Sequence, residues 1–133
     1  MALNAWHLTL TLLEETFAVC RLPCDAPIPE WADVGPFASI TRTREELSVT
    51  CLQRGMPDDI QAERDWRCLK VEGPFDLAST IGVMAALAVP LAEAGISLFV
   101  VSTYDTDYLL LKERQLTPAV EVLSAAGHTV NAH

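Results

Sequence analysis

Two carboxylates separated by one residue are the most chemically suggestive feature of this sequence. They are Asp105 and Asp107, in the run Tyr-Asp-Thr-Asp that follows an apolar stretch. Residues two apart on a strand or turn can face the same way, so this pair could attract an ammonium or guanidinium group. A third carboxylate, Asp76, precedes an apolar helical pattern, and the unpaired N–H groups at a helix start suit a carboxylate ligand. An amino acid carries both of these charges.

Each acidic residue also has a simpler interpretation. Asp76 is a typical N-cap residue, and Asp105 is a typical turn residue. Two close carboxylates can serve acid–base catalysis or hold a hard metal ion, but no third partner accompanies them here. No Ser or Cys has a recognisable base near it, and no Gly-rich phosphate loop is present. The sequence therefore predicts no catalytic residues, no metal site and no cofactor.

Composition and charge narrow the class of protein. The chain has 133 residues, of which 18 are acidic and 9 basic, so the formal net charge is −9. An acidic surface argues against nucleic acid as a partner, because phosphate binding needs basic residues. The longest uncharged apolar run, residues 77–92, is too short to cross a membrane.

The cysteines and the N-terminal residues indicate the cellular compartment in which the protein is expected. The N-terminal residues lack the basic region and cleavage site of a signal peptide. The spacing of the four cysteines is a poor zinc signature, and without a secretion signal disulfides are not expected. We therefore predict a cytoplasmic protein whose cysteines behave as small hydrophobic residues, namely Cys20, Cys24, Cys51 and Cys68.

Alternating apolar residues make the first half of the chain mostly β. Residues 6–13 and 17–22 predict a hairpin with a short turn at residues 14–16. A loop with four prolines follows at residues 23–36, with room for one short helical turn. Residues 37–41 and 47–52 predict two further strands.

The second half alternates strands and helices. A strand at residues 67–71 precedes a helix at residues 77–94, capped by Asp76, ended by Gly95 and containing Pro90 well inside. Strands follow at residues 96–103 and 107–112, then a helix capped by Thr117, and a short edge strand at residues 128–130. This order, β-α-β-β-α-β, is the ferredoxin-like pattern of an α+β fold.

The run PLAEAGISLFVVSTYDTDYLLLKE, residues 90–113, resembles an ACT domain, a small module that binds amino acids and regulates metabolic proteins. It looks like the unit of bacterial tandem-ACT proteins, is similar to one in the animal cytosolic arginine sensors, and more distantly resembles the regulatory regions of aspartate kinases. The resemblance covers residues 66–130. Residues 1–62 are similar to the β-rich, ACT-like half that precedes such a unit, so we predict two domains, 1–62 and 63–133.

The resemblance also implies where a ligand would bind, largely through backbone groups, at an interface between ACT units. In the arginine sensors the position matching Asp107 holds the cationic end of the ligand, whereas Thr80 stands where they carry an acidic residue. The implied ligand-binding residues come from the start of the first helix, the start of the next strand and the hairpin turn: Phe75, Asp76, Ser79, Thr80 and Gly82; Gly95, Ile96, Ser97 and Leu98; Thr103, Tyr104, Thr106 and Asp107.

These residues lead to one main hypothesis and two alternatives. The first is a non-catalytic regulatory protein, a homodimer that binds a small amino acid or similar metabolite. The second is a ligand-free interaction module that dimerises through its sheets and binds a protein partner, with side chains such as Tyr104 or Leu98 filling the pocket. The third is a small enzyme that depends on Asp107. None of the three involves nucleic acid or a membrane.

Overall fold

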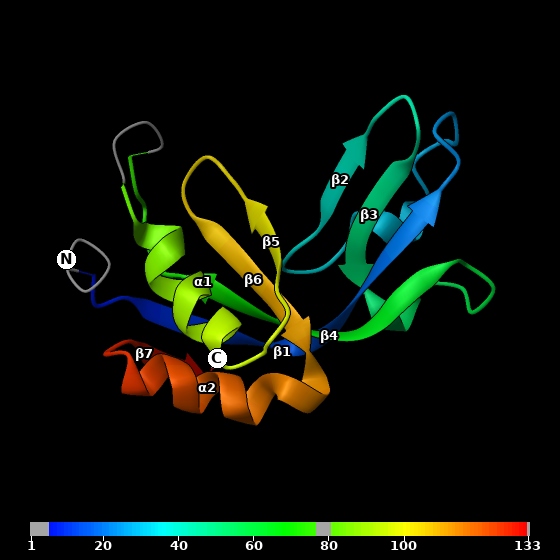
Figure 1. Ribbon diagram of the computed structural model, residues 1–133. Helices are drawn as coiled ribbons and strands as arrows, with labels where there is room; N and C mark the ends of the chain where they lie inside the picture. The colour runs from blue at the N-terminus through cyan, green and yellow to red at the C-terminus, as the bar shows by residue number, and fades with distance from the viewer. Residues whose placement is uncertain (1–5, 77–80, 133) are drawn as a thin grey trace. The chain divides into compact units, whose positions relative to one another are not determined.

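The chain forms two compact units in the computed structural model, which describes residues 6–76 and 81–132 (Figure 1). Unit 1 comprises Met1–Glu14 and Arg67–His133, and unit 2 comprises Glu15–Trp66. Two long strands, β1 (Thr9–Leu22) and β4 (Ala62–Val71), contribute residues to both units. The units therefore differ from the predicted ranges, because the first residues of the chain belong with its C-terminal half.

Unit 2 is β-rich, as the sequence predicts. Its strands β2 (Ser39–Arg42) and β3 (Leu47–Leu52) pair antiparallel, and β3 pairs antiparallel with the second part of β1. The predicted helical turn in the proline-rich loop is present as a short 3-10 helix at Glu30–Ala32. Small and medium apolar residues fill the core of this unit, including Ala18, Cys20, Ala32, Leu47, Val49, Cys51 and Met56.

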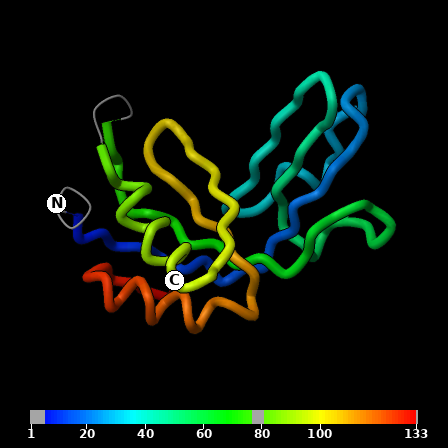
Figure 2. The backbone as a smooth tube through the Cα atoms, viewed as in Figure 1, coloured from blue at the N-terminus to red at the C-terminus, as the bar shows by residue number. Residues whose placement is uncertain are grey.

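The predicted N-terminal hairpin is wrong, because residues 9–22 form one uninterrupted strand, β1 (Figure 2). Its partner changes along its length: Thr9–Leu12 pair in parallel with β7 (Thr129–Ala132), and Phe17–Leu22 pair with β3. Residues 14–16 contain none of the Gly, Pro, Asn or Asp residues that favour a turn. Glu14 and Glu15 are consecutive, so they point to opposite faces of the strand, and neither side chain is buried.

Unit 1 has the predicted β-α-β-β-α-β order from β4 onward. The elements are β4, α1 (Val83–Glu93), β5 (Phe99–Ser102), β6 (Asp107–Lys112), α2 (Leu116–Ala125) and β7. The first part of β1 is an additional strand, so the order across the sheet is β7-β1-β4-β6-β5. Both helices pack on one face of this sheet through apolar residues, including Leu10, Leu69, Val71, Leu87, Leu91, Leu109, Leu111 and Leu123.

Helix α1 begins later than predicted. Its N-cap is Gly82, which has a left-handed φ of 83°, and the helix starts at Val83. The expectation that Asp76 caps this helix is therefore wrong. A left-handed residue cannot belong to a right-handed helix, so Gly82 separates α1 from the chain before it. The predicted residues 77–80 lie outside the described part of the chain.

Pro90 lies inside α1, as the sequence indicates, and a histidine compensates for it. A proline has no N–H, so residue 90 cannot donate to the carbonyl of Ala86 one turn earlier. The ring of His128 lies 3.0 Å from that oxygen through Nε2. Its Nδ1 accepts a bond from the Leu8 N–H at 3.1 Å, so Nε2 carries the proton and donates to Ala86. His128 is buried and joins β7, the start of β1 and α1.

The remaining elements of unit 1 differ from prediction only at their ends. β6 spans the predicted residues, and β5 is shorter because the Ile96 N–H still bonds the Leu91 carbonyl at the end of α1. α2 follows a 3-10 turn at Glu113–Gln115 and starts at Leu116, one residue before the predicted cap Thr117. In the described part of the chain, no helix is both long and apolar enough to cross a membrane.

Candidate functional site

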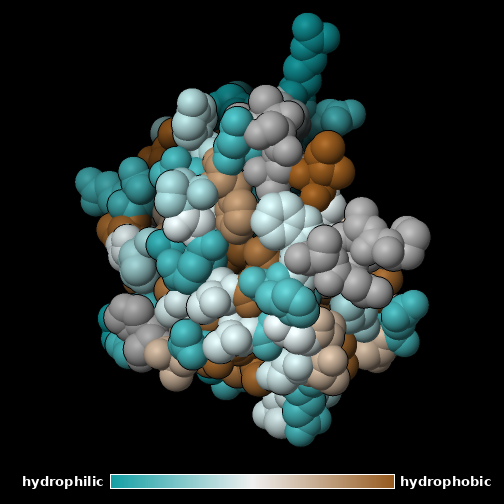
Figure 3. All heavy atoms as spheres, turned by 90° about the vertical axis from the view of Figure 1, so that its left-hand side faces the viewer, coloured by the Kyte–Doolittle hydropathy of each residue, from teal (hydrophilic) through white to brown (hydrophobic). Residues whose placement is uncertain are grey.

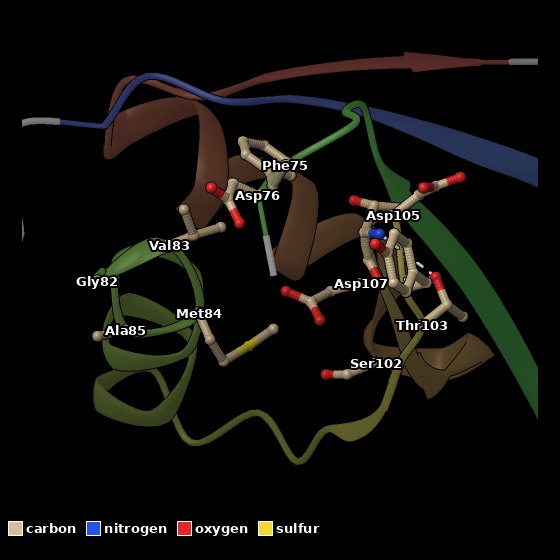
Figure 4. Close-up of a pocket in the computed structure, with 12 residues that line it drawn as sticks. Phe75, Asp76, Gly82, Val83, Met84, Ala85, Ser102, Thr103, Asp105 and Asp107 are labelled. Carbon is tan, nitrogen blue, oxygen red and sulfur yellow. Dashed lines mark hydrogen bonds between the residues drawn. The ribbon is translucent and has the colours of Figure 1, made fainter. Parts of the chain in front are cut away.

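A pocket of about 340 Å³ lies in unit 1 between the start of α1 and the turn that joins β5 to β6 (Figure 4). Three segments supply its lining: the chain after β4, the first turn of α1, and the β5–β6 turn. The lining residues are Phe75, Asp76, Gly82, Val83, Met84, Ala85, Ser102, Thr103, Tyr104, Asp105, Thr106 and Asp107.

The β5–β6 turn is a rigid wall of this pocket. The Thr103 N–H donates to the Thr106 carbonyl at 2.8 Å, and the Thr103 hydroxyl donates to the same oxygen at 3.0 Å. The hydroxyl of buried Thr106 donates to the Val71 carbonyl at 2.5 Å, which ties the turn to β4. Because this hydroxyl already serves the fold, Thr106 contributes mainly shape to the pocket.

A backbone contact holds the chain after β4 against the same turn. The Phe75 N–H donates to the Asp105 carbonyl at 2.8 Å. A Cβ at Gly73 would lie 3.1 Å from that carbonyl oxygen and from the Phe75 nitrogen, so glycine permits this close approach. The contact places Asp76 on the pocket wall across from the start of β6.

The carboxylates do not all face the pocket. Figure 4 shows Asp107 pointing into the hollow, toward Asp76 and the side chain of Met84, whereas the Asp105 carboxylate points away from them. The expectation that Asp105 and Asp107 face the same way is therefore wrong, because Asp105 lies in the turn and Asp107 is the first residue of β6. The described residues that line the pocket include acids but no Lys, Arg or His, so its potential is negative on the sheet side.

The helix side of the pocket has the opposite polarity. The first intrahelical bond of α1 runs from the Ala86 N–H to the Gly82 carbonyl at 2.9 Å. The N–H groups of Val83, Met84 and Ala85 precede this bond in the first turn of α1, where N–H groups have no acceptor within their own helix. They also carry the positive end of the helix dipole. One side of the pocket thus suits an anion, and the Asp107 side suits a cation.

The structure brings together only part of the predicted ligand-binding set. Seven of the predicted residues line the pocket, namely Phe75, Asp76, Gly82, Thr103, Tyr104, Thr106 and Asp107. Ser79 and Thr80 lie outside the described residues. The other four, Gly95, Ile96, Ser97 and Leu98, occupy the opposite end of α1 and its connection to β5. Ligand binding by these residues remains a prediction.

Val83, Met84, Ala85 and Ser102 also line the pocket and were not predicted. The helical pattern begins at residue 77, which places the expected helix start six residues before the observed one. A glycine at position 82, inside an otherwise apolar helical pattern, is the sequence signal that indicates the later start.

Comparison with known proteins identifies the family. A family model described as "ACT domain" matches residues 61–125, and a second, described as an N-terminal domain, matches residues 15–59. Residues 61–125 of the chain are therefore an ACT domain. The matched ACT domain runs from β4 to α2 and contains every described residue that lines the pocket.

Several proteins are similar to this ACT-domain protein. A crystal structure of an Agrobacterium tumefaciens protein is 39% identical, with a TM-score of 0.90 and coverage of 97% of this chain and 96% of that one. The mouse (Mus musculus) cytosolic arginine sensor for mTORC1, subunit 1, is 27% identical over 128 residues, which are 90% of this chain and 35% of the sensor. The chain thus spans about a third of the length of the curated arginine sensors it matches.

The fold also resembles that of aspartate kinase regulatory regions. The regulatory subunit of the Thermus flavus aspartate kinase superposes with a TM-score of 0.58 at 15% identity, covering 91% of this chain and 97% of that one. At this identity the likeness concerns the fold. It confirms the ferredoxin-like α+β architecture of an ACT protein.

Proposed function

We propose that this protein is a non-catalytic regulatory sensor that binds a small amino acid or a related metabolite in the pocket of unit 1. The observation that carries the proposal is the Asp107 carboxylate facing the first turn of α1 across a hollow of about 340 Å³. An α-amino acid has an anionic and a cationic group on one carbon, and the pocket offers a partner for each.

The bound amino acid would take a defined orientation. Its carboxylate would accept hydrogen bonds from the N–H groups of Val83 and Met84, where the helix dipole adds attraction. Its ammonium group would bind the Asp107 carboxylate, with Asp76 on the neighbouring wall. Because the lining carries acids and no base among the described residues, we propose that neutral and cationic amino acids bind better than acidic ones.

The related proteins support a regulatory role. One group is named for sensing arginine and another for regulating aspartate kinase. Binding of an amino acid would act by favouring one assembly or partner-binding state, in proportion to its difference in affinity between states. The partner that reads this state is a further protein, and the action takes place in the cytoplasm.

We also propose that the protein is a homodimer. β5 pairs with β6 on one side and has no strand on its other side in the described sheet of unit 1. A second copy could extend the sheet at this edge. The residues before β5, Gly95 to Leu98, would then lie near the neighbouring copy and complete the binding site.

Two observations favour the sensor over a ligand-free interaction module. That alternative expects Tyr104 or Leu98 to fill the pocket, but Tyr104 is 81% exposed and Leu98 packs against the core. On the face shown in Figure 3, hydrophobic residues form separate patches and not one continuous area. Large exposed apolar patches are the usual mark of a protein-binding surface.

A thermal-shift titration of the full chain against the twenty amino acids tests the proposal. At one hundred times the dissociation constant, a bound amino acid adds about 2.7 kcal/mol, which raises Tm by several degrees. We expect one or a few neutral or cationic amino acids to do this. Asp107→Asn should abolish the shift, and Asp105→Asn, the matched control whose carboxylate points away, should retain it.

The same titration can refute the proposal. No shift from any amino acid at millimolar concentration would remove its basis. Equal shifts in the wild type and Asp107→Asn would place the binding site elsewhere.

A further inference from the structure

The start of α1 is held from outside the pocket by a residue near the beginning of the chain. The indole Nε1 of Trp6 donates a hydrogen bond to the Ile81 carbonyl at 2.8 Å, across 75 residues of sequence. The same ring packs edge-to-face on Phe75, with centroids 6.1 Å apart and planes at 80°. Trp6 is not among the residues that line the pocket, but Phe75 and Gly82, which follows Ile81, both line it.

A second link joins the same N-terminal residues to α1. The Leu8 N–H bonds His128, and His128 donates to the carbonyl of Ala86 in the first turn of the helix. Residues 6–8 are therefore linked to the helix start at two points, directly through Trp6 and indirectly through His128. One contact, at Ile81, precedes the left-handed Gly82, and the other follows it.

These contacts determine the direction of the pocket's backbone groups. A peptide unit is planar, so fixing the Ile81 carbonyl also fixes the N–H of Gly82 in the same plane. Gly82 adopts a φ of 83°, and a glycine in this region has access to other conformations unless its neighbours restrain it. Trp6 supplies that restraint through its hydrogen bond to the carbonyl of Ile81, which precedes Gly82.

We infer that Trp6 is a positioning residue, which sets the affinity of the pocket by holding Phe75 and the start of α1 in their binding arrangement. This inference rests on the proposed function, since it concerns the same pocket. A pocket that is already held in its binding arrangement loses less conformational entropy when an amino acid binds, so its affinity is higher. By linkage, an occupied pocket must in turn stabilise the docked state of Trp6 by the same factor.

The first test compares Trp6→Phe with the wild type in the full chain. Phenylalanine keeps an aromatic ring near Phe75 but is smaller than tryptophan and has no donor for the Ile81 carbonyl. The loss of one hydrogen bond predicts a dissociation constant raised by about 2- to 10-fold, measured by calorimetry with whichever of the twenty amino acids gives the largest thermal shift in the wild type. Trp31→Phe, in unit 2, is the matched control and should leave the dissociation constant unchanged.

The second test needs no substitution. The indole N–H of Trp6 gives its own signal in ¹H–¹⁵N spectra, and saturation with the same amino acid should slow its exchange with solvent. The indole signals of Trp31 and Trp66, both in unit 2, should exchange at unchanged rates. A purely structural role for Trp6 predicts no such dependence on the amino acid.

The outcomes separate this inference from the proposed function. If the wild type binds none of the twenty amino acids, both fail, and the wild-type titration alone shows it. If the wild type binds but Trp6→Phe binds equally well, or if the Trp6 indole exchanges at the same rate with and without the amino acid, only the positioning role is overturned.

Discussion

The replacement of a missing helical N–H by a histidine can be tested by a double-mutant cycle. His128→Ala would leave two buried backbone groups without their present partner, the Leu8 N–H and the Ala86 carbonyl. Each buried unsatisfied group costs about 1–3 kcal/mol, so we expect a loss of about 2–6 kcal/mol in the free energy of unfolding. Pro90→Ala should change this cost, because the substitution restores a backbone N–H one turn after Ala86.

In the Pro90→Ala background, His128→Ala should cost less by about 1–3 kcal/mol, since only the Leu8 N–H then lacks a partner. The free energies come from urea unfolding followed by circular dichroism, with equal m values required for the comparison. Two further variants assign the bonds. His128→Gln can place a donor near the Nε2 position and serve Ala86, whereas His128→Asn can place an acceptor near the Nδ1 position and serve Leu8.

Additive losses would refute this reasoning. If the double variant equals the sum of the two single variants within about 0.5 kcal/mol, His128 does not replace the donor that Pro90 lacks.

Three further predictions concern single residues. Thr106→Val should lower the free energy of unfolding by about 1–3 kcal/mol in chemical denaturation, because the Val71 carbonyl loses its donor. Thr106→Ser keeps the hydroxyl and should lower it less. Equal losses in the two variants would contradict the role of this hydrogen bond. Gly82→Ala should cost about 1–2 kcal/mol through its left-handed φ of 83°, while Gly55→Ala, with no atom within 4 Å of a Cβ, should be close to neutral. Burial raises the pKa of the Cys51 thiol to about 12 from 9.0, so between these pH values the folded state keeps a proton that the unfolded chain releases. The free energy of unfolding should therefore fall as pH rises from about 9 toward 12. If Cys51→Ala shows the same slope of unfolding free energy against pH, this reasoning is refuted.

Local signals explain why much of unit 1 is predictable. The run at residues 107–112 is apolar and bounded by turn residues, and it forms β6 over the predicted span. Gly95 follows the end of α1 with a φ of 76°, as expected of a residue that terminates a helix. The order of strands and helices follows from such signals, because each depends on residues a few positions apart.

Long-range pairing explains the errors. The two strand patterns at the N-terminus belong to one strand because β7 and β3 hold its two parts, and neither partner is near in sequence. Similarly, nothing in the sequence around Pro90 indicates that a histidine 38 positions later serves the carbonyl of Ala86.

The sequence by itself determined the α+β class, the β-α-β-β-α-β order and, through a family resemblance, the turn that contains Asp107. Only the tertiary structure decided that Asp107 faces the pocket and Asp105 does not, that α1 starts after Gly82, and that Trp6 and His128 support the helix start. The physical reason is the separation along the chain over which each kind of interaction acts. Propensities and turn signals act between neighbouring residues, whereas the pocket depends on hydrogen bonds between residues as far apart as 75 and 120 positions.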